Sequence, residues 1–339
     1  MLACLRFSKI FGVFPLRLSG TYPSKWFRCK YCTIWSAILI VTYSLAMSDF
    51  MYSTIERRPL SFVLTLLPFT ISSVVTDASI RISSTRSCND LIRFLELTAK
   101  YGKQHDRSFM GYFWSLLILF ATTAVALFVG FGLIFPEIGV TASGLKLGPE
   151  WNRVLSFWNF FSYFMHDGSL LCALCFLIVF GRRAVSCFKF LCGEITEYCL
   201  RNLYLSSNTF QTLDKVQLPK ASSLDEGDEL IDKFLELKAA FGIYMKVGEI
   251  FTFALVTDIG TWIFFLACTV LFNDDTIKSG FLFTVTACQS LITVLMLITI
   301  AELGHQLRSK VNAVNAKNQE VSQNSKNKLM IFLTGGTAA

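Results

Sequence analysis

The chain has 339 residues, of which 53% are apolar and only 16% are charged, whereas an ordinary soluble domain has roughly 25% charged residues. Phenylalanine occurs 33 times, more than the core of one soluble domain of this size needs, so the composition excludes an ordinary soluble protein. The formal charge of +7 does not indicate nucleic-acid binding, because the basic residues flank long apolar segments on alternate sides, as membrane topology requires. We therefore expect an integral membrane protein with helical spans.

The chain begins with MLACLRFSKIFGVFPLRLSG. The apolar stretch from Ile10 to Leu16 is short and is broken by Pro15, and no small-residue cleavage site follows it, so the segment does not have the pattern of a signal peptide. We expect residues 1–30 to be retained as a cytosolic amino-terminal segment.

Six segments are apolar enough to cross a bilayer, which takes about 20 helical residues. In the fourth of them, His166 and Asp167 are the only acidic, basic or histidine side chains, and in the fifth Asp258 is the only one. The pattern predicts an all-α fold, a polytopic membrane helical bundle within residues 31–303. The six predicted spans are residues 31–48, 59–76, 110–135, 154–180, 250–272 and 279–301.

Lysine and arginine cluster at alternate connections, which predicts that these connections are cytosolic. The opposite connections carry few basic residues, namely Arg57 and Arg58, then Lys146 and Arg153, then Lys278. The amino terminus is therefore expected in the cytosol, and six spans would leave the carboxyl terminus there too. The first two basic connections contain Arg6, Lys9, Arg17, Lys25, Arg28 and Lys30, and then Arg81, Arg86, Arg93, Lys100, Lys103 and Arg107.

The cytosolic loop 181–248 is expected to be helical on both sides of a polar break at about 206–227. Apolar residues recur at helical spacing before the break, from Val185 to Cys199, and after it, from Leu230 to Tyr244. Residues 302–317 are expected to extend the sixth span in the same way. Such extensions predict a packed cytosolic anchor bundle, and the alternative is amphipathic helices lying on the lipid surface.

The sequence contains no motif that indicates an enzyme. There is no P-loop, no dinucleotide-binding glycine motif, no HExxH and no nucleophile elbow. The three histidines are far apart, and the CxxC pairs Cys29/Cys32 and Cys172/Cys175 have no second pair at zinc spacing. We expect no catalytic activity, no cofactor and no metal. Packing of small side chains is the favoured role of the cysteines, with S-palmitoylation of Cys29 and Cys32 as an alternative.

Charged groups inside spans are candidates for a binding site, because burying one there costs at least ~2.5 kcal/mol. Asp77 is expected near the inner end of the second span, where its side chain can reach the membrane interface. In an outward-facing cavity, acidic groups beside aromatic rings would suit a small polar or amphipathic ligand. The alternative is that each aspartate bonds a neighbouring serine or threonine hydroxyl and only fixes helix packing. The candidate ligand-binding residues are Trp158, Phe161, Tyr163, His166, Asp167, Asp258 and Trp262.

Two strings resemble the arthropod gustatory receptor family of insect-type chemosensory receptors. They are FGVFPL at residues 11–16 and AELGHQLRSKVN at 301–312, and the long fourth-to-fifth loop and high phenylalanine content are similar as well. The resemblance implies a ligand-gated, tetrameric, cation-conducting channel with seven spans in the plasma membrane. It implies a small-molecule tastant and related receptor subunits in a homo- or hetero-tetramer as partners, with a ligand cavity in the outer half.

The family signature TYhhhhhQF in the seventh span, where h is hydrophobic, is absent here. After Lys328 the sequence reads LMIFLTGGTAA, and six apolar residues cannot cross a bilayer. Residues 304–339 are thus expected to be a cytosolic tail that stops before a seventh span.

Two other classes of protein stay open. A G-protein-coupled receptor would need an outside amino terminus, a DRY motif after the third span and an NPxxY motif, and the sequence offers none of these. A membrane transporter could use Asp167 and Asp258 to carry coupling ions, but the halves of the chain show no repeat and no paired broken spans.

Overall fold

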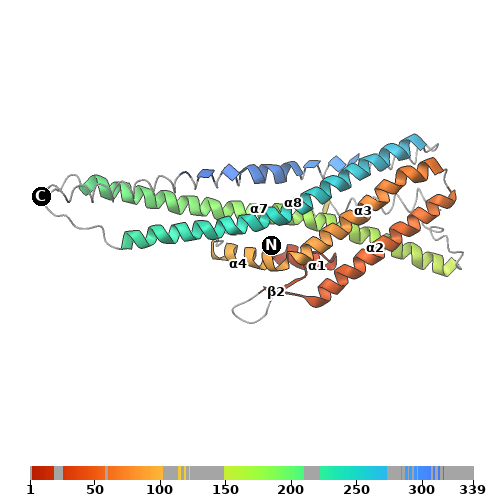
Figure 1. Cartoon of the computed structure of the whole chain (residues 1–339), viewed down its shortest axis with the longest axis horizontal. Coiled ribbons are helices and arrows are strands. Elements are labelled where there is room, and N and C mark those ends of the chain that lie inside the picture. The colour runs from red at the N-terminus through yellow and green to blue at the C-terminus, as the bar shows by residue number, and fades with distance from the viewer. Residues whose placement is uncertain are drawn as a thin grey trace. The chain divides into compact units, whose positions relative to one another are not determined.

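The computed structural model describes residues 2–18, 26–57, 60–101, 149–209, 222–272 and 297–306, together with scattered positions between 114 and 122 and between 284 and 316. In these residues the elements are α-helices apart from one short hairpin, in which β1 (Leu16–Leu18) pairs antiparallel with β2 (Trp26–Arg28) (Figure 1). The predicted all-α membrane fold is confirmed. The helices are α1 (Leu2–Ile10), α2 (Lys30–Arg57), α3 (Leu60–Arg86), α4 (Cys88–Tyr101), α7 (Pro149–Thr209) and α8 (Ser222–Phe272).

Three segments of the described residues are long and apolar enough to cross a membrane, and they overlap the first, fourth and fifth predicted spans. They are Lys30–Tyr52, Phe157–Tyr198 and Glu229–Phe264. The second predicted span lies in α3, where Pro68 removes one backbone hydrogen bond, a loss that neighbouring helices in a membrane bundle tolerate. The third predicted span lies mostly outside the described residues, about half of the sixth is described, and the tail after residue 316 lies outside them.

The helices α7 and α8 are continuous over 61 and 51 residues. This continuity confirms that the fourth span extends beyond the predicted membrane segment as a helix and that the helix at 230–244 runs straight into the fifth span. The predicted polar break at 206–227 is too long, because α7 continues to Thr209 and α8 begins at Ser222. Acidic residues at 225, 228 and 229 favour an early start of α8, because they complement the positive end of the helix dipole. Residues 210–221 lie outside the described part.

The chain divides into two compact units. Unit 1 consists of Met1–Ile92, His105–Phe180 and Met245–Ile300, and unit 2 of Arg93–Gln104, Gly181–Tyr244 and Ala301–Ala339. Within unit 1, α2 and α3 lie side by side (Figure 1). The basic connection after the second predicted span contains α4, of which residues 88–92 belong to unit 1 and residues 93–101 to unit 2. Amphipathic α4 buries Leu91, Phe94 and Leu95 completely or almost completely.

In unit 2, the extensions of α7 and α8 pack against each other. The rings of Phe188 and Phe241 meet edge to face with centroids 6.3 Å apart, and Lys233 Nζ lies 3.6 Å from Glu194 Oε2. Arg183 Nη2 donates a 2.9 Å hydrogen bond to the carbonyl of Thr98. These contacts confirm the predicted packing of the helical extensions, while their placement in the cytosol stays a prediction.

The amino-terminal segment is part of the core of unit 1. After α1 ends at Ile10, the side chains of Phe11, Val13, Phe14 and Leu16 are at most 2% exposed. The Phe14 ring packs on Phe176 at a centroid distance of 4.8 Å and on Phe251 at 5.6 Å. The resemblance string FGVFPL is therefore packed between helices and is not a free segment.

Gly12 is required at its position by backbone conformation and by space. Its φ of 68° lies in the left-handed region, which favours glycine. A Cβ added there would lie 2.9 Å from Arg81 Nη1, 3.0 Å from Leu39 Cδ1 and 3.0 Å from the Cα of Ser36. The last of these is backbone of α2 and cannot turn aside, so α2 and the amino-terminal segment approach each other closely because residue 12 has no side chain.

Replacing Gly12 by alanine is expected to destabilise the protein by roughly 1–3 kcal/mol, because the new side chain forces both strain and a clash. Thermal unfolding of the purified protein in detergent micelles, followed by tryptophan fluorescence, measures the loss. Gly242→Ala is the matched control, because nothing lies within 4 Å of a Cβ there and alanine gains up to about 1 kcal/mol in a helix. Equal losses of stability in the two variants would contradict the conclusion that position 12 has no space for a side chain.

Candidate functional site

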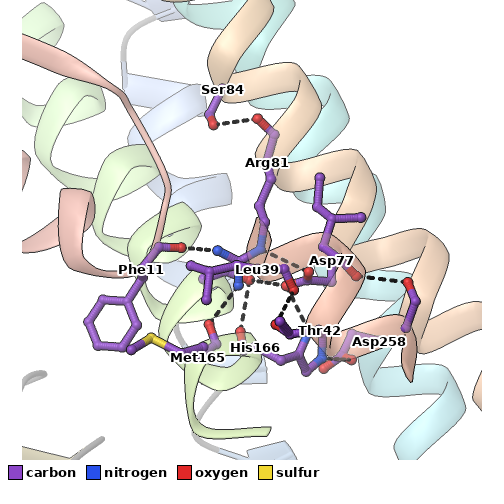
Figure 2. Close-up of polar contacts among 12 residues, drawn as sticks. Phe11, Leu39, Thr42, Asp77, Arg81, Ser84, Met165, His166 and Asp258 are labelled. Carbon is purple, nitrogen blue, oxygen red and sulfur yellow. Dashed lines mark hydrogen bonds and ion pairs between the residues drawn. The ribbon is translucent and has the colours of Figure 1, made fainter. Parts of the chain in front are cut away.

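A cluster of buried ionisable side chains lies in unit 1, where α3, α7 and α8 come together. Asp77 and Arg81 come from α3, His166 from α7 and Asp258 from α8 (Figure 2). Their exposed fractions are 1% and 0%, then 2% and 7%. Buried charges are stable only when they are paired and hydrogen-bonded, so the contacts of each group decide what the cluster can do.

Asp77 is the centre of the cluster. Its Oδ2 accepts a 2.8 Å hydrogen bond from Arg81 Nε, one helical turn away on the same face. Its Oδ1 accepts a 3.0 Å bond from the Ser169 hydroxyl and lies 3.2 Å from Nδ1 of His166. The carboxylate thus joins α3 to α7 through Oδ1, while Oδ2 pairs with Arg81 on its own helix.

Arg81 connects α3 to two further segments. Its Nη1 donates to the carbonyl of Phe11, and its Nη2 donates a 2.8 Å hydrogen bond to the carbonyl of Met165 on α7 (Figure 2). A guanidinium can make such divergent bonds because its donors form a rigid planar fork. The carbonyl of Phe11 belongs to the amino-terminal segment, so this segment is fixed to the charged cluster.

Asp77 and Arg81 are at most 1% exposed, so both side chains lie inside the protein. The reason is that α3 continues past the predicted end of the second span, to Arg86, which places both residues within the bundle. The level of Asp77 relative to the membrane interface and the cytosolic side of Arg81 stay predictions. An aspartate and an arginine four residues apart in a helix are a sequence signal for such a pair.

His166 lies between two carboxylates. Its Nε2 is 3.7 Å from Oδ1 of Asp258, and neither of these two atoms has a hydrogen-bond partner among the described residues. The ring of Tyr43 on α2 stacks on the imidazole with centroids 4.3 Å apart and an angle of 11° between planes. When His166 is protonated, the positive charges of Arg81 and His166 balance the negative charges of Asp77 and Asp258.

Aromatic side chains from four helices adjoin this cluster. Tyr43 meets Tyr163 of α7 edge to face at a centroid distance of 6.0 Å. Phe69 of α3 meets Trp262 of α8 in the same way at 5.3 Å. Tyr163 and Trp262 pack against a buried core that contains Tyr43, Met47 and Phe69. Rings and ionisable groups therefore form one contiguous site.

The structure brings together four of the seven predicted site residues, namely Tyr163, His166, Asp258 and Trp262. Trp158 lies apart from them, because it is 42% exposed and its ring packs on Phe161, at a centroid distance of 6.0 Å. Asp167 is half-buried. Asp77 accepts a hydrogen bond from the hydroxyl of Ser169. This is the helix-packing role that the sequence analysis gives as the alternative for Asp167 and Asp258, at a different aspartate.

Sequence reasoning missed Tyr43, Phe69, Asp77 and Arg81 as members of this site. Nothing in the local pattern around Tyr43 or Phe69 distinguishes them from other apolar positions of their spans. No group of three or more His, Cys, Asp or Glu side chains in the described part of the chain is arranged to hold a metal ion.

The amino-acid sequence matches no family model and no curated relative. The structure is similar to that of the insect olfactory receptor OR5 from Machilis hrabei, with a TM-score of 0.54, over 96% of this chain and 88% of that chain. The chain has the fold of this receptor. The sequences are only 14% identical over the match, so the likeness establishes the fold and not the ligand or the activity.

Removing the charge of Asp77 is expected to destabilise the protein by about 3–5 kcal/mol, because Arg81 then stays buried without its anionic partner. Asp77→Asn, Arg81→Met and the double variant form a thermodynamic cycle, measured by thermal unfolding in micelles. The double variant should lose less stability than the sum of the single losses. Asp49→Asn is the control, because Asp49 is only partly buried and accepts a 2.7 Å bond from the neutral side chain of Asn159. Additive losses at positions 77 and 81 would contradict the buried pair.

Proposed function

We propose that this chain is a subunit of an insect-type chemosensory receptor that acts as a ligand-gated cation channel, and specifically a receptor of the gustatory kind. One observation carries the proposal, namely the structural likeness to an insect olfactory receptor over 96% of the chain. The sequence strings at 11–16 and 301–312 support the gustatory subtype, because they resemble that family. In this proposal the chain assembles with three copies of itself or of related subunits in the plasma membrane.

The ligand in this proposal contacts the site formed by Tyr163, His166, Asp258 and Trp262. Nε2 of His166 and Oδ1 of Asp258 are 3.7 Å apart and make no hydrogen bond among the described residues. They are therefore available to a polar group of the ligand, and the aromatic rings suit its apolar part. Since these residues come from α7 and α8, a ligand that binds between them changes the preferred spacing of the two helices. Binding then shifts the closed-to-open equilibrium by its difference in affinity for the two states.

A membrane transporter is the second candidate, because the buried carboxylates and histidine of unit 1 are the kind of groups that carry coupling protons across a membrane. Substrate flux without channel current would favour this alternative.

An epitope tag at the amino terminus is expected to be inaccessible to antibody on intact cells and accessible after permeabilisation, because basic residues flank this end of the first span. The matched control is a tag inserted next to Lys146, in a connection that the same argument places outside. Staining of the amino-terminal tag on intact cells would contradict the receptor-channel proposal and would favour a G-protein-coupled receptor.

Asp258→Asn and Trp262→Ala are each expected to raise the ligand concentration for half-maximal cation current by about tenfold or more, equivalent to ~1.4 kcal/mol of binding free energy. The measurement is whole-cell current from cells that co-express related receptor subunits, with a panel of sugars and bitter compounds as ligands. Asp90→Asn, which changes a carboxylate on α4 that pairs with Lys246 at 3.2 Å, should leave the response unchanged. If the wild-type protein reaches the cell surface and no compound evokes current, the channel proposal fails.

A further inference from the structure

Residues 10–16, named here the amino-terminal latch, contact four helices of unit 1. The carbonyl of Ile10 accepts a 2.9 Å hydrogen bond from Trp35 Nε1 on α2, and the carbonyl of Phe11 accepts one from Arg81 on α3. The Phe14 ring packs on Phe176 of α7 and on Phe251 of α8. One short segment thus touches each of the helices that build the candidate ligand site.

A continuous chain of polar contacts joins the latch to the far side of that site. It runs from the carbonyl of Phe11 through Arg81 and Asp77 to His166, and from there to Asp258 (Figure 2). All four side chains are buried, so water does not compensate for a broken contact. We therefore expect a shift of His166 or Asp258 to move Asp77 and with it Arg81, whose Nη1 donates a hydrogen bond to the carbonyl of Phe11 in the latch.

The latch is held in its conformation by these contacts and not by its intrinsic preference. Gly12 and Phe14 have φ values of 68° and 52°, and the second is uncommon for a bulky residue without tertiary support. Releasing the latch relieves this conformation at the same time as it breaks the contacts. A released state would thus exchange the contacts for a relaxed backbone, and a switch requires two such competing states.

We propose that the amino-terminal latch holds the resting arrangement of α3, α7 and α8, and that a change at the His166–Asp258 pair releases it. The seating of the latch does not depend on the proposed receptor function, whereas the coupling of its release to ligand binding and cation current rests on it.

Gly168 offers a way to disturb the latch without changing any charge. A Cβ added at this position of α7 would overlap the ring of Phe11, so glycine leaves the space that the ring fills. Gly168→Ala should displace Phe11, and Phe11→Ala should remove the conflict.

The experiment measures tryptic cleavage of the Lys9–Ile10 bond in the full chain in detergent micelles, by mass spectrometry of the released peptide. The carbonyl of Lys9 accepts a 3.1 Å hydrogen bond from the amide of Gly12, so the bond is protected while the latch is seated. Asp258→Asn should raise the cleavage rate by about tenfold or more, although Asp258 lies at the opposite end of the polar chain from the latch. Asp49→Asn, the control carboxylate, should not change the rate. An unchanged rate in Asp258→Asn, with size-exclusion chromatography showing a folded protein, overturns the proposal.

The steric variants test the latch independently of charge. Gly168→Ala should raise the cleavage rate severalfold, and Phe11→Ala/Gly168→Ala should be cleaved no faster than Phe11→Ala alone, because the added methyl group then meets empty space. If the two substitutions multiply each other's effect on the cleavage rate, the packing of the Phe11 ring against Gly168 of α7 is overturned.

Current measurements test the coupling. In cells where the wild-type protein gives ligand-evoked current, Gly168→Ala should raise the ligand-free current severalfold. An unchanged ligand-free current overturns the proposed link between release of the latch and opening of the channel. Absence of any evoked current in the wild-type protein is a failure of the proposed receptor function. It is distinguished from failure of the latch because protease protection is measured without ligand or current.

Discussion

A guanidinium with no exposed surface is the constraint around which unit 1 is arranged. Burying such a charge without partners costs several kcal/mol, and Arg81 obtains its partners from three different places in the chain. They are the carboxylate of Asp77 on α3 and the carbonyls of Phe11 and Met165. Because each acceptor must stay within hydrogen-bond reach, the register of α3 against α7 and the seat of the amino-terminal segment are fixed together.

The same constraint reaches the candidate ligand site through Asp77. Long apolar helices in a membrane can slide past one another at little cost, because lipid and side chains are equally apolar. Directional contacts such as those of Asp77 with His166 and Ser169 remove this freedom. The ring of Tyr43, which stacks on the imidazole of His166, restricts the position of His166 further. A ligand that contacts His166 or Asp258 therefore acts on the groups that set helix register, which gives the proposed receptor a physical route from binding to a change of conformation.

Several parts of the fold could be predicted because they depend on local pattern alone. Apolar length places α2 and the spans within α7 and α8, and helical spacing of apolar residues predicts their extensions in unit 2. His166 and Asp258 stand out because a charge inside an apolar span needs a reason. Trp158 was grouped with them by its depth along the sequence, but its side chain is 42% exposed, since depth along a helix does not specify which face of the helix a residue occupies.

By itself, the sequence determined that this chain is a helical membrane protein and which segments are long and apolar enough to be its helices, because a bilayer imposes one strict rule of length and polarity on every span. The tertiary structure alone decided that the Asp77–Arg81 pair is buried, that residues 11–16 belong to the core, and that Tyr43 and Phe69 join the site. These facts depend on contacts between residues far apart in the chain, such as Phe11 with Arg81 and Asp77 with His166. Such contacts arise only when the helices pack, and no local pattern of residues records them.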